Sequence, residues 1–368
     1  MSWCDAVFAL EADDDVRVRA RALLGRAWPL FATNDVAALE EVCNEAADLS
    51  RTIGDRPVLA NALALRGNAL AFSDPGAAAP VLHEAVGVAR ETGEVYALAL
   101  ALLYSGQCHR WTDGDALGDR LLEEAIDVCR RHGEDECLAE ALMLQSLHAV
   151  LSGDYPQGEA CAEEAGALAR HVGSFFAAEQ SQVTLAIARQ RQGHDEVAHQ
   201  LIHEAVAAIR RASPDLGAYL AGLEALIAFE SGRITDATES ADAAVAFYHA
   251  SGAVVLATQA LGIRGLVRWA AGDLAGASAS CREALDFAER SGVRWWSGLA
   301  LEGLGRVARA EGDVRALAAR HHEALVHCHR VGERPADLVE FDDRTRPSVR
   351  QRERHRARHR RLLVDEVH

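Results

Sequence analysis

The feature that most constrains the fold is a marker that recurs every 39 or 40 residues. The marker is the Ala of a Glu-Ala step, and its copies are Ala46, Ala85, Ala125, Ala165, Ala205, Ala244, Ala284 and Ala324. Seven of the eight follow a Glu, and Ala243 is the exception. Chance does not keep such a register from residue 46 to residue 324. A fixed period of this length is typical of proteins built from repeated structural units.

Two turn signals divide each unit into halves. One set is Asn34-Asp35, Asp74-Pro75, Asp113-Gly114, Gly153-Asp154, Gly193, Gly232, Gly272-Asp273 and Gly312-Asp313; the other is Gly54, Gly93, Gly133, Gly173, Ser213-Pro214, Gly252, Gly292 and Gly332. Gly closes a helix in the left-handed conformation, and Asp or Ser caps the next helix. Between the signals, small or apolar residues recur at steps of three and four, as in Ala277, Cys281 and Ala284. This spacing predicts two amphipathic helices per unit.

A helical hairpin of this size cannot cover its own apolar stripe, so each hairpin packs on the next. We therefore predict an all-α fold, a right-handed solenoid of about eight antiparallel helix hairpins. We expect the array to span residues 16–334. Residues 1–15 would form a lead-in, and residues 335–368 an Arg-rich tail that we expect to be poorly ordered.

The unit resembles the tetratricopeptide repeat (TPR). The resemblance rests on small residues near the end of the first helix (Gly265, Gly305) and on small residues five and twelve positions after the turn (Ala277 and Ala284; Ala198 and Ala205). It covers roughly residues 16–332. Units of 39 to 40 residues resemble the long-repeat arm of large bacterial ATP-binding transcriptional regulators of the LuxR and maltose-regulator type.

This sequence departs from those regulators in two ways. The array begins near residue 1 and 36 residues follow Gly332, so we expect neither their ATPase domain nor their helix-turn-helix domain, and the resemblance implies a detached arm. Peptide-binding members of the repeat family clamp a terminal carboxylate with Lys and Asn. The chain contains no lysine, so that specificity is not carried over.

Composition narrows the function classes. The chain has 49% hydrophobic residues and a net charge of −17, which is typical of a globular protein. Its acidic start and its lack of a long apolar run predict neither a signal peptide nor a membrane span. Eight cysteines without a C-x-x-C motif favour a reduced, cytoplasmic protein. Without lysine there is neither a P-loop lysine nor a Schiff base.

Two motifs imitate functional sites. The stretch 303–308, GLGRVA, has the spacing of a dinucleotide fingerprint but lies inside an expected helix, where close helix contact explains its glycines better. His322 and His327 are five residues apart, which places them on different helix faces, about 140° apart at 100° per residue.

A looser metal cluster from His321, His322, His327, Cys328 and His329 stays open, although core and surface positions explain these residues better. Cys43, Cys161 and Cys281 share one packing position and are interpreted as small buried hydrophobes. We predict no enzyme activity, no cofactor and no metal.

The candidate binding surface is the concave side of the array, lined by the first helix of each hairpin. Three residues before each turn stand Leu70, Arg110, Val150, Gln190, Phe229, Trp269 and Arg309; six before stand Gln107, Leu147, Ile187, Leu226, Leu266 and Arg306. We expect a groove that is apolar in the middle with arginines toward both ends. Aromatic residues and Arg dominate recognition, so Trp111, Tyr219, Trp295 and Trp296 are added as anchors. The alternative is that these large side chains fill gaps between hairpins.

The end of the chain differs in charge from the rest. Residues 344–368 carry a net charge of +6, which leaves −23 for residues 1–343. The run 344–361 is the one place where we expect contact with nucleic acid, through Arg and phosphate. A solvated arm that folds back on the acidic body explains it better.

Three functional classes remain. The first is a non-enzymatic scaffold that binds a protein or peptide in its groove, in bacterial regulation or signalling. The second is a detached sensor arm that binds a small-molecule effector and acts on transcription through a partner protein. The third, an enzyme, has the least support, because the motifs that chemistry needs fail on their context.

Overall fold

The computed structural model describes residues 16–33, 35–112, 116–212, 214–251, 254–313, 315–317, 319–320 and 322–323. These residues form helices and turns, without a strand among them. The helices are α2 (Val16–Thr33), α3 (Val36–Ile53), α4 (Arg56–Ser73), α5 (Pro75–Thr92), α6 (Val95–Thr112), α7 (Ala116–His132), α8 (Asp135–Leu151), α9 (Tyr155–Val172), α10 (Phe175–Arg191), α11 (Asp195–Ala212), α12 (Pro214–Glu230), α13 (Ile234–Ser251), α14 (Val254–Ala270), α15 (Leu274–Ser291) and α16 (Ser297–Glu311).

The helices pair into seven antiparallel hairpins, from α2 with α3 to α14 with α15, and α16 opens an eighth. The partner of α16 falls largely outside the described residues, as do the lead-in 1–15 and the tail 335–368. Within the described array the all-α solenoid predicted from the repeat is confirmed. Even-numbered helices are called first helices below, and odd-numbered ones second helices.

The turn signals act as the sequence predicts. Gly54, Gly93, Gly173 and Gly292 end second helices with φ between 70° and 78°, in the left-handed region where a glycine carries no steric penalty. At the starts of α4 and α9, the Asp55 and Asp154 carboxylates accept the N–H of Val58 and Gln157. Each such cap stabilises its helix by about 1 kcal/mol.

In each Glu-Ala marker the Ala packs inside the array and the Glu lies on its surface. The described marker alanines, Ala46, Ala85, Ala125, Ala165, Ala205, Ala244 and Ala284, are all 0% exposed, because a methyl group is what fits where helices approach closely. The Glu before the marker lies outside. Arg90 pairs with Glu124 at 2.5 Å and Arg130 with Glu164 at 3.0 Å, each across one hairpin boundary. Such exposed pairs contribute less than about 1 kcal/mol each.

Glycines in the first helices allow the closest helix contacts. A Cβ on Gly265 of α14 or on Gly303 of α16 would collide with the Cys281 Sγ of α15, at 2.5 Å in the case of Gly303. The fingerprint-like stretch 303–308 therefore lies inside α16, and Gly303 serves close packing. Cys43 and Cys281 are buried and Cys161 is partly buried, and all three are free thiols.

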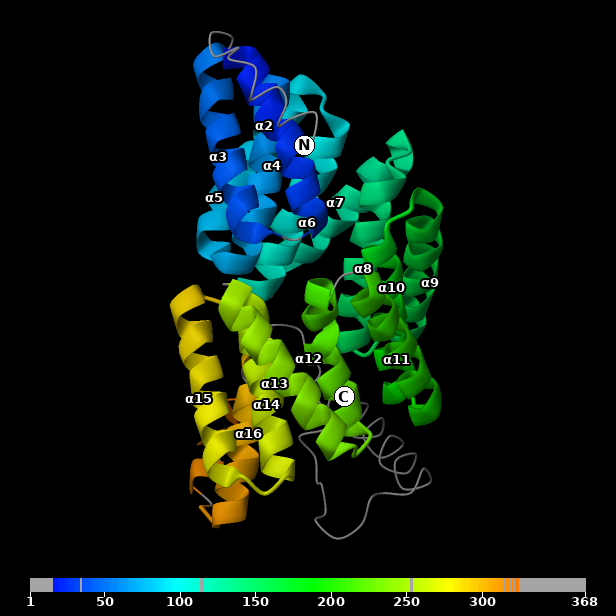
Figure 1. Cartoon of the computed structure of the whole chain (residues 1–368), viewed down its shortest axis with the longest axis vertical. Helices are drawn as coiled ribbons and strands as arrows, with labels where there is room; N and C mark the ends of the chain where they lie inside the picture. Colours follow the sequence, from blue (N-terminus) through cyan, green and yellow to red (C-terminus); the bar gives the residue numbers. More distant parts are fainter. Residues whose placement is uncertain are drawn as a thin grey trace, which may run out of the picture.

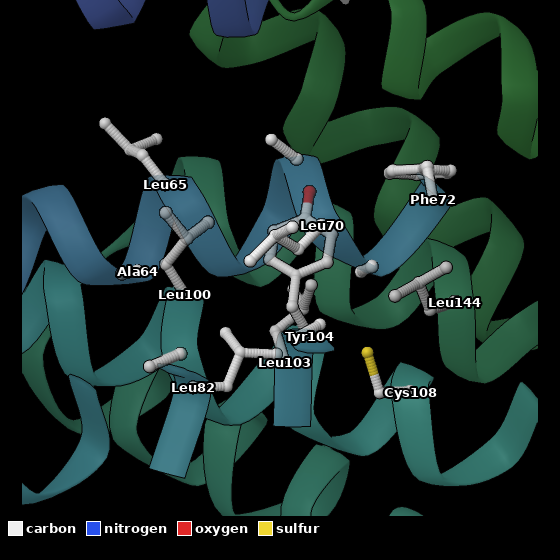
Figure 2. Packing of buried hydrophobic residues seen from close by; sticks show 14 of the residues in the cluster. Ala64, Leu65, Leu70, Phe72, Leu82, Leu100, Leu103, Tyr104, Cys108 and Leu144 are labelled. Atoms are coloured by element: carbon white, nitrogen blue, oxygen red, sulfur yellow. The ribbon is translucent and has the colours of Figure 1, made fainter. Parts of the chain in front are cut away.

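First helices lie on the concave side. Neighbouring first helices contact one another along the whole described array, whereas second helices mainly contact the first helices beside them. The core is built between them, and Figure 2 shows Leu103, Tyr104 and Cys108 of α6 in one layer with Phe72 of α4 and Leu144 of α8.

The array bends round until distant hairpins meet. In Figure 1 the yellow helices α14 and α15 lie next to the blue and cyan helices α4 to α6, and α14 contacts α4. The segment between α15 and α16 seals this junction: the N–H groups of Arg294 and Trp295 both donate to the Trp111 carbonyl, at 2.7 and 3.1 Å. The second and seventh hairpins therefore touch across the concave side, a contact that the repeat pattern did not predict.

Among the described helices, none has both the length and the hydropathy needed to cross a membrane. In the same part of the chain, no three His, Cys, Asp or Glu side chains are grouped so as to hold a metal ion. Of the histidine-rich candidate, residues 321 and 327–329 lie outside the described residues.

Candidate functional site

A cavity of about 90 Å³ lies at the centre of the bend and is called the central cavity below. It is enclosed by first helices from α4 to α14, by α13 and by the segment before α16. Figure 2 shows four of its lining residues, Phe72, Leu103, Tyr104 and Leu144. The others are Gln107, Trp111, Glu140, Met143, Leu147, His148, Phe176, Gln180, Leu223, Tyr248, Leu256, Gln259, Trp295 and Trp296.

One end of the cavity carries a carboxyl group. Glu140 of α8 is partly buried, and its Oε2 accepts the Tyr104 hydroxyl of α6 at 3.2 Å. Burial raises the pKa of Glu140 to about 7; the Tyr104 hydrogen bond opposes this shift, and the charge of Glu136 adds to it. Burial also raises the pKa of Tyr104 well above its usual value, so its hydroxyl stays protonated. The carboxyl of Glu140 therefore changes charge near neutral pH.

The other end of the cavity is lined by aromatic rings, and the positive charge of Arg110 lies behind them. The Trp295 ring packs against His148 with a centroid separation of 5.5 Å, and the Arg110 guanidinium lies 4.4 Å from the Trp295 ring centroid. Arg110 also pairs with Asp119 at 3.3 Å. Burial, and then the charge of Arg110, lower the pKa of His148 to about 3. His148 is therefore a neutral ring at physiological pH.

Four lining side chains, each no more than 9% exposed, hold a buried polar atom without a hydrogen-bond partner within the protein. These atoms are Gln107 Oε1, His148 Nδ1, Gln180 Oε1 and Trp296 Nε1. Buried polar groups in native proteins are nearly always hydrogen-bonded. Four such atoms around one cavity indicate that it is filled by polar guest molecules, either water or a ligand.

A second feature lies on the concave side of the last hairpins and is called the arginine-aromatic patch below. It consists of Phe229 of α12, Trp269 of α14 and Arg306 of α16. The Arg306 guanidinium lies 4.8 Å from the Trp269 ring centroid and 5.7 Å from that of Phe229. Glu302, one turn earlier, holds Arg306 in an ion pair. All three patch residues are partly exposed, so rings and guanidinium are accessible to a partner.

The structure sorts the predicted site residues into two groups. Gln107, Trp111, Trp295 and Trp296 line the central cavity, and Arg110 stacks on Trp295 from outside it. Phe229, Trp269 and Arg306 form the patch, and Arg309 is exposed one turn after Arg306.

Other residues predicted to line the groove are buried between helices. Gln190 is 5% exposed and donates to the Ile227 carbonyl at 2.9 Å, so it joins two hairpins and does not face a partner. The expected apolar floor of the groove is buried too, at Leu70, Val150, Ile187, Leu226 and Leu266. The side chain of Tyr219 lies outside the described residues.

Sequence reasoning missed Glu140, Gln180 and Gln259. They stand thirteen residues before the turn glycines Gly153, Gly193 and Gly272. These positions lie seven residues before the predicted groove positions six residues before each turn, to which Gln107 belongs. Seven residues are about two helical turns, so both sets lie on the same helix face. The repeat register therefore held the signal, since polar residues recur there in otherwise apolar helices. His148 belongs to no such row.

A scan against protein-family models and a search of curated proteins found no match. Solved structures are similar to the chain in fold. It matches a Rap protein complexed with competence and sporulation factor at 12% identity and a TM-score of 0.58, over 84% of this chain and 87% of that one. It matches a signal transduction ATPase with a tetratricopeptide repeat sensor from Pyrococcus horikoshii at 11% identity and a TM-score of 0.50, over 86% and 48%. It also matches yeast Tom70 at 14% identity and a TM-score of 0.44, over 90% and 63%.

The fold is that of a TPR-like helical-repeat protein. At these identities the likeness shows the fold and nothing further. The chain spans less than two thirds of the length of Tom70 and about half that of the ATPase.

Proposed function

We propose that this protein is a non-enzymatic TPR-like scaffold that binds a protein or peptide partner on its concave side, in bacterial cytoplasmic regulation. The observation that carries the proposal is the arginine-aromatic patch, where the guanidinium of α16 lies near two rings, one from α12 and one from α14. Trp and Arg are the residues that most often dominate binding energy. The similar Rap protein was solved in complex with competence and sporulation factor, which supports binding as the role of such an array.

The test is capture of partners from a native extract with purified protein. We expect Trp269→Ala combined with Arg306→Ala to lose the specific partner, because truncating two central anchors weakens binding by about 30-fold or more. The matched control is Phe287→Ala combined with Arg290→Ala. This pair also stacks at 4.8 Å, but on the second helix α15. Equal capture by the wild type, the patch variant and the control would remove the patch from the account.

The central cavity supports a second candidate, a detached sensor arm that binds a small-molecule effector and acts through a partner protein. The LuxR-type unit length suggests the same role. A thermal-shift screen with metabolites tests it, since a ligand that binds the folded form raises the unfolding midpoint. A screen that leaves the midpoint unchanged for every metabolite counts against this candidate.

A further inference from the structure

The central cavity has an unusual mixture of linings. One lining residue, Glu140, carries an ionisable carboxyl group, and among the described lining residues none is an arginine. Most of the remaining wall is aromatic or aliphatic. We infer that the central cavity binds a small arylalkyl amine in its protonated form, with the ammonium group at Glu140 and the ring toward Trp295 and Trp296. This inference names the ligand class for the second candidate function, rests on that candidate, and is independent of the arginine-aromatic patch.

Charge selects a cation over an anion. A charged group enters a low-dielectric cavity only when it meets an opposite charge or several hydrogen bonds. The Glu140 carboxylate supplies the opposite charge to an ammonium group. An anion finds no such partner in the wall, because Arg110 lies behind the Trp295 ring and is paired with Asp119.

Shape selects a small and elongated molecule. One water molecule needs roughly 10 to 15 Å³ of cavity volume. The cavity of about 90 Å³ therefore has room for about six to nine waters, or for a ligand with a similar number of non-hydrogen atoms. Glu140 and His148 are eight residues apart on one helix, which separates the two ends by about 12 Å. The arylalkyl amine 2-phenylethylamine matches this size, with its charge at one end and its ring at the other.

The unpartnered polar atoms agree with this orientation. Gln107 and Gln180 line the cavity, and each presents an oxygen without a donor, which a ligand N–H or a bridging water would satisfy. Trp296 presents an N–H without an acceptor at the aromatic end. A hydroxyl on the ligand ring would satisfy that N–H, so we expect tyramine to bind more tightly than 2-phenylethylamine.

The experiment is calorimetric titration of the full chain at pH 8 with 2-phenylethylamine, its neutral counterpart 2-phenylethanol, and the anion phenylacetate. We expect the amine to bind at least about tenfold more tightly than either of the others, a preference that only a charge partner in the site supplies. A phenylalanyl-alanine amide distinguishes a free amine from a peptide terminus. We expect it not to bind, because it exceeds the cavity.

Two variants assign the ammonium to its partner. Glu140→Gln keeps the size and an acceptor for Tyr104, and we expect it to lose about 30-fold or more in amine affinity while 2-phenylethanol binds as before. Glu136→Gln is the matched control, one turn earlier on α8 and exposed, and we expect a change of less than about threefold. Circular dichroism verifies that both variants are folded.

The pH dependence of the amine affinity separates direct binding by Glu140 from a merely structural role, which would not change it. The titratable groups near this carboxyl are Glu136 and Cys137 on α8 and Tyr96 and Tyr104 on α6. Because Glu140 must be ionised to bind the cation, raising the pH from about 6 to about 8 strengthens amine binding about tenfold in the wild type and not in Glu140→Gln.

Several results would overturn the inference. They include absence of amine binding in the wild type, equal binding of the alcohol or the anion, and equal losses in Glu136→Gln and Glu140→Gln. Binding of the peptide amide would assign the ammonium to a peptide terminus and refute the free-amine ligand. Partner capture through the patch is measured separately with the Trp269 and Arg306 variants, so failure there leaves the cavity result standing.

Discussion

Glu140 and His148 sit at opposite ends of one face of α8, and their titrations act on stability in opposite directions. The pKa of Glu140 is raised to about 7 in the folded chain from 4.5. Between these values the folded chain keeps a proton that the unfolded chain has lost, so this group lowers stability as the pH rises. The pKa of His148 is lowered to about 3 from 6.5. There the unfolded chain holds the extra proton, so stability rises with pH. From about pH 4.5 to 6.5 the two effects offset each other.

Substituting each residue singly separates the two contributions to the pH dependence of stability. We expect Glu140→Gln to match the wild type near pH 4 and to exceed its stability above pH 7 by about 1–2 kcal/mol, after allowance for the partial exposure of the carboxyl. We expect His148→Gln to gain stability relative to the wild type as the pH falls from 6.5 toward 3, where burial, and then the charge of Arg110, disfavour the imidazolium. Urea unfolding at each pH measures both differences. A difference for Glu140→Gln that is the same at pH 4 and pH 8 would show that its carboxyl is not titrating near neutrality.

At the scale of elements, the closest contact joins three helices at one sulfur atom. Cys281 of α15 lies between Gly265 of α14 and Gly303 of α16. We expect Gly303→Ala to destabilise the protein by about 1–3 kcal/mol despite the better helix propensity of Ala, because the added Cβ has no room beside Cys281 Sγ. In Cys281→Ala that sulfur is gone, so the double variant should lose at least about 0.5 kcal/mol less than the sum of the single losses.

Gly87 of α5 provides the control for this pair. It is exposed, and a Cβ there meets nothing within 4 Å. Gly87→Ala should therefore be neutral or stabilise by up to about 1 kcal/mol. Thermal and urea unfolding of the four variants test the comparison. Strict additivity of Gly303→Ala and Cys281→Ala would contradict a packing role for this contact.

The elements were predictable because their signals are local. The Asp caps, the left-handed glycines and the buried marker alanines such as Ala125 each follow from residues a few positions apart in sequence. Gln190 shows where this reasoning fails. Counting from the turn places it in the groove row, but its amide is taken up by the carbonyl of Ile227 in the next hairpin. Whether a polar side chain faces a partner or a neighbouring helix depends on the rotation between hairpins, which the repeat period does not contain.

At the scale of the whole molecule, small rotations between hairpins add up until the array meets itself. The contact of α14 with α4 and the hydrogen bonds of Arg294 and Trp295 to Trp111 close the bend. This closure creates the central cavity and buries Trp295, which the sequence suggested as a binding anchor. The repeat pattern predicts each step of the array but not the sum of its rotations. The register contained a signal for Glu140, whereas the place of His148 in the cavity was found only in three dimensions.

The central claim is therefore that hairpins far apart in sequence touch, and the absence of lysine makes it directly measurable. We propose cross-linking of the double variant Thr112→Lys and Arg294→Lys with a short amine-reactive reagent, followed by mass spectrometry. Apart from the N-terminal amine, the two introduced lysines are the only reactive amines. The control pairs Arg294→Lys with Arg56→Lys, which stands at the far end of α4, about 24 Å along the helix from Phe72. We expect a link between positions 112 and 294 and none between 56 and 294. A folded variant in which positions 112 and 294 never link within one chain would contradict the closed array and the cavity with it.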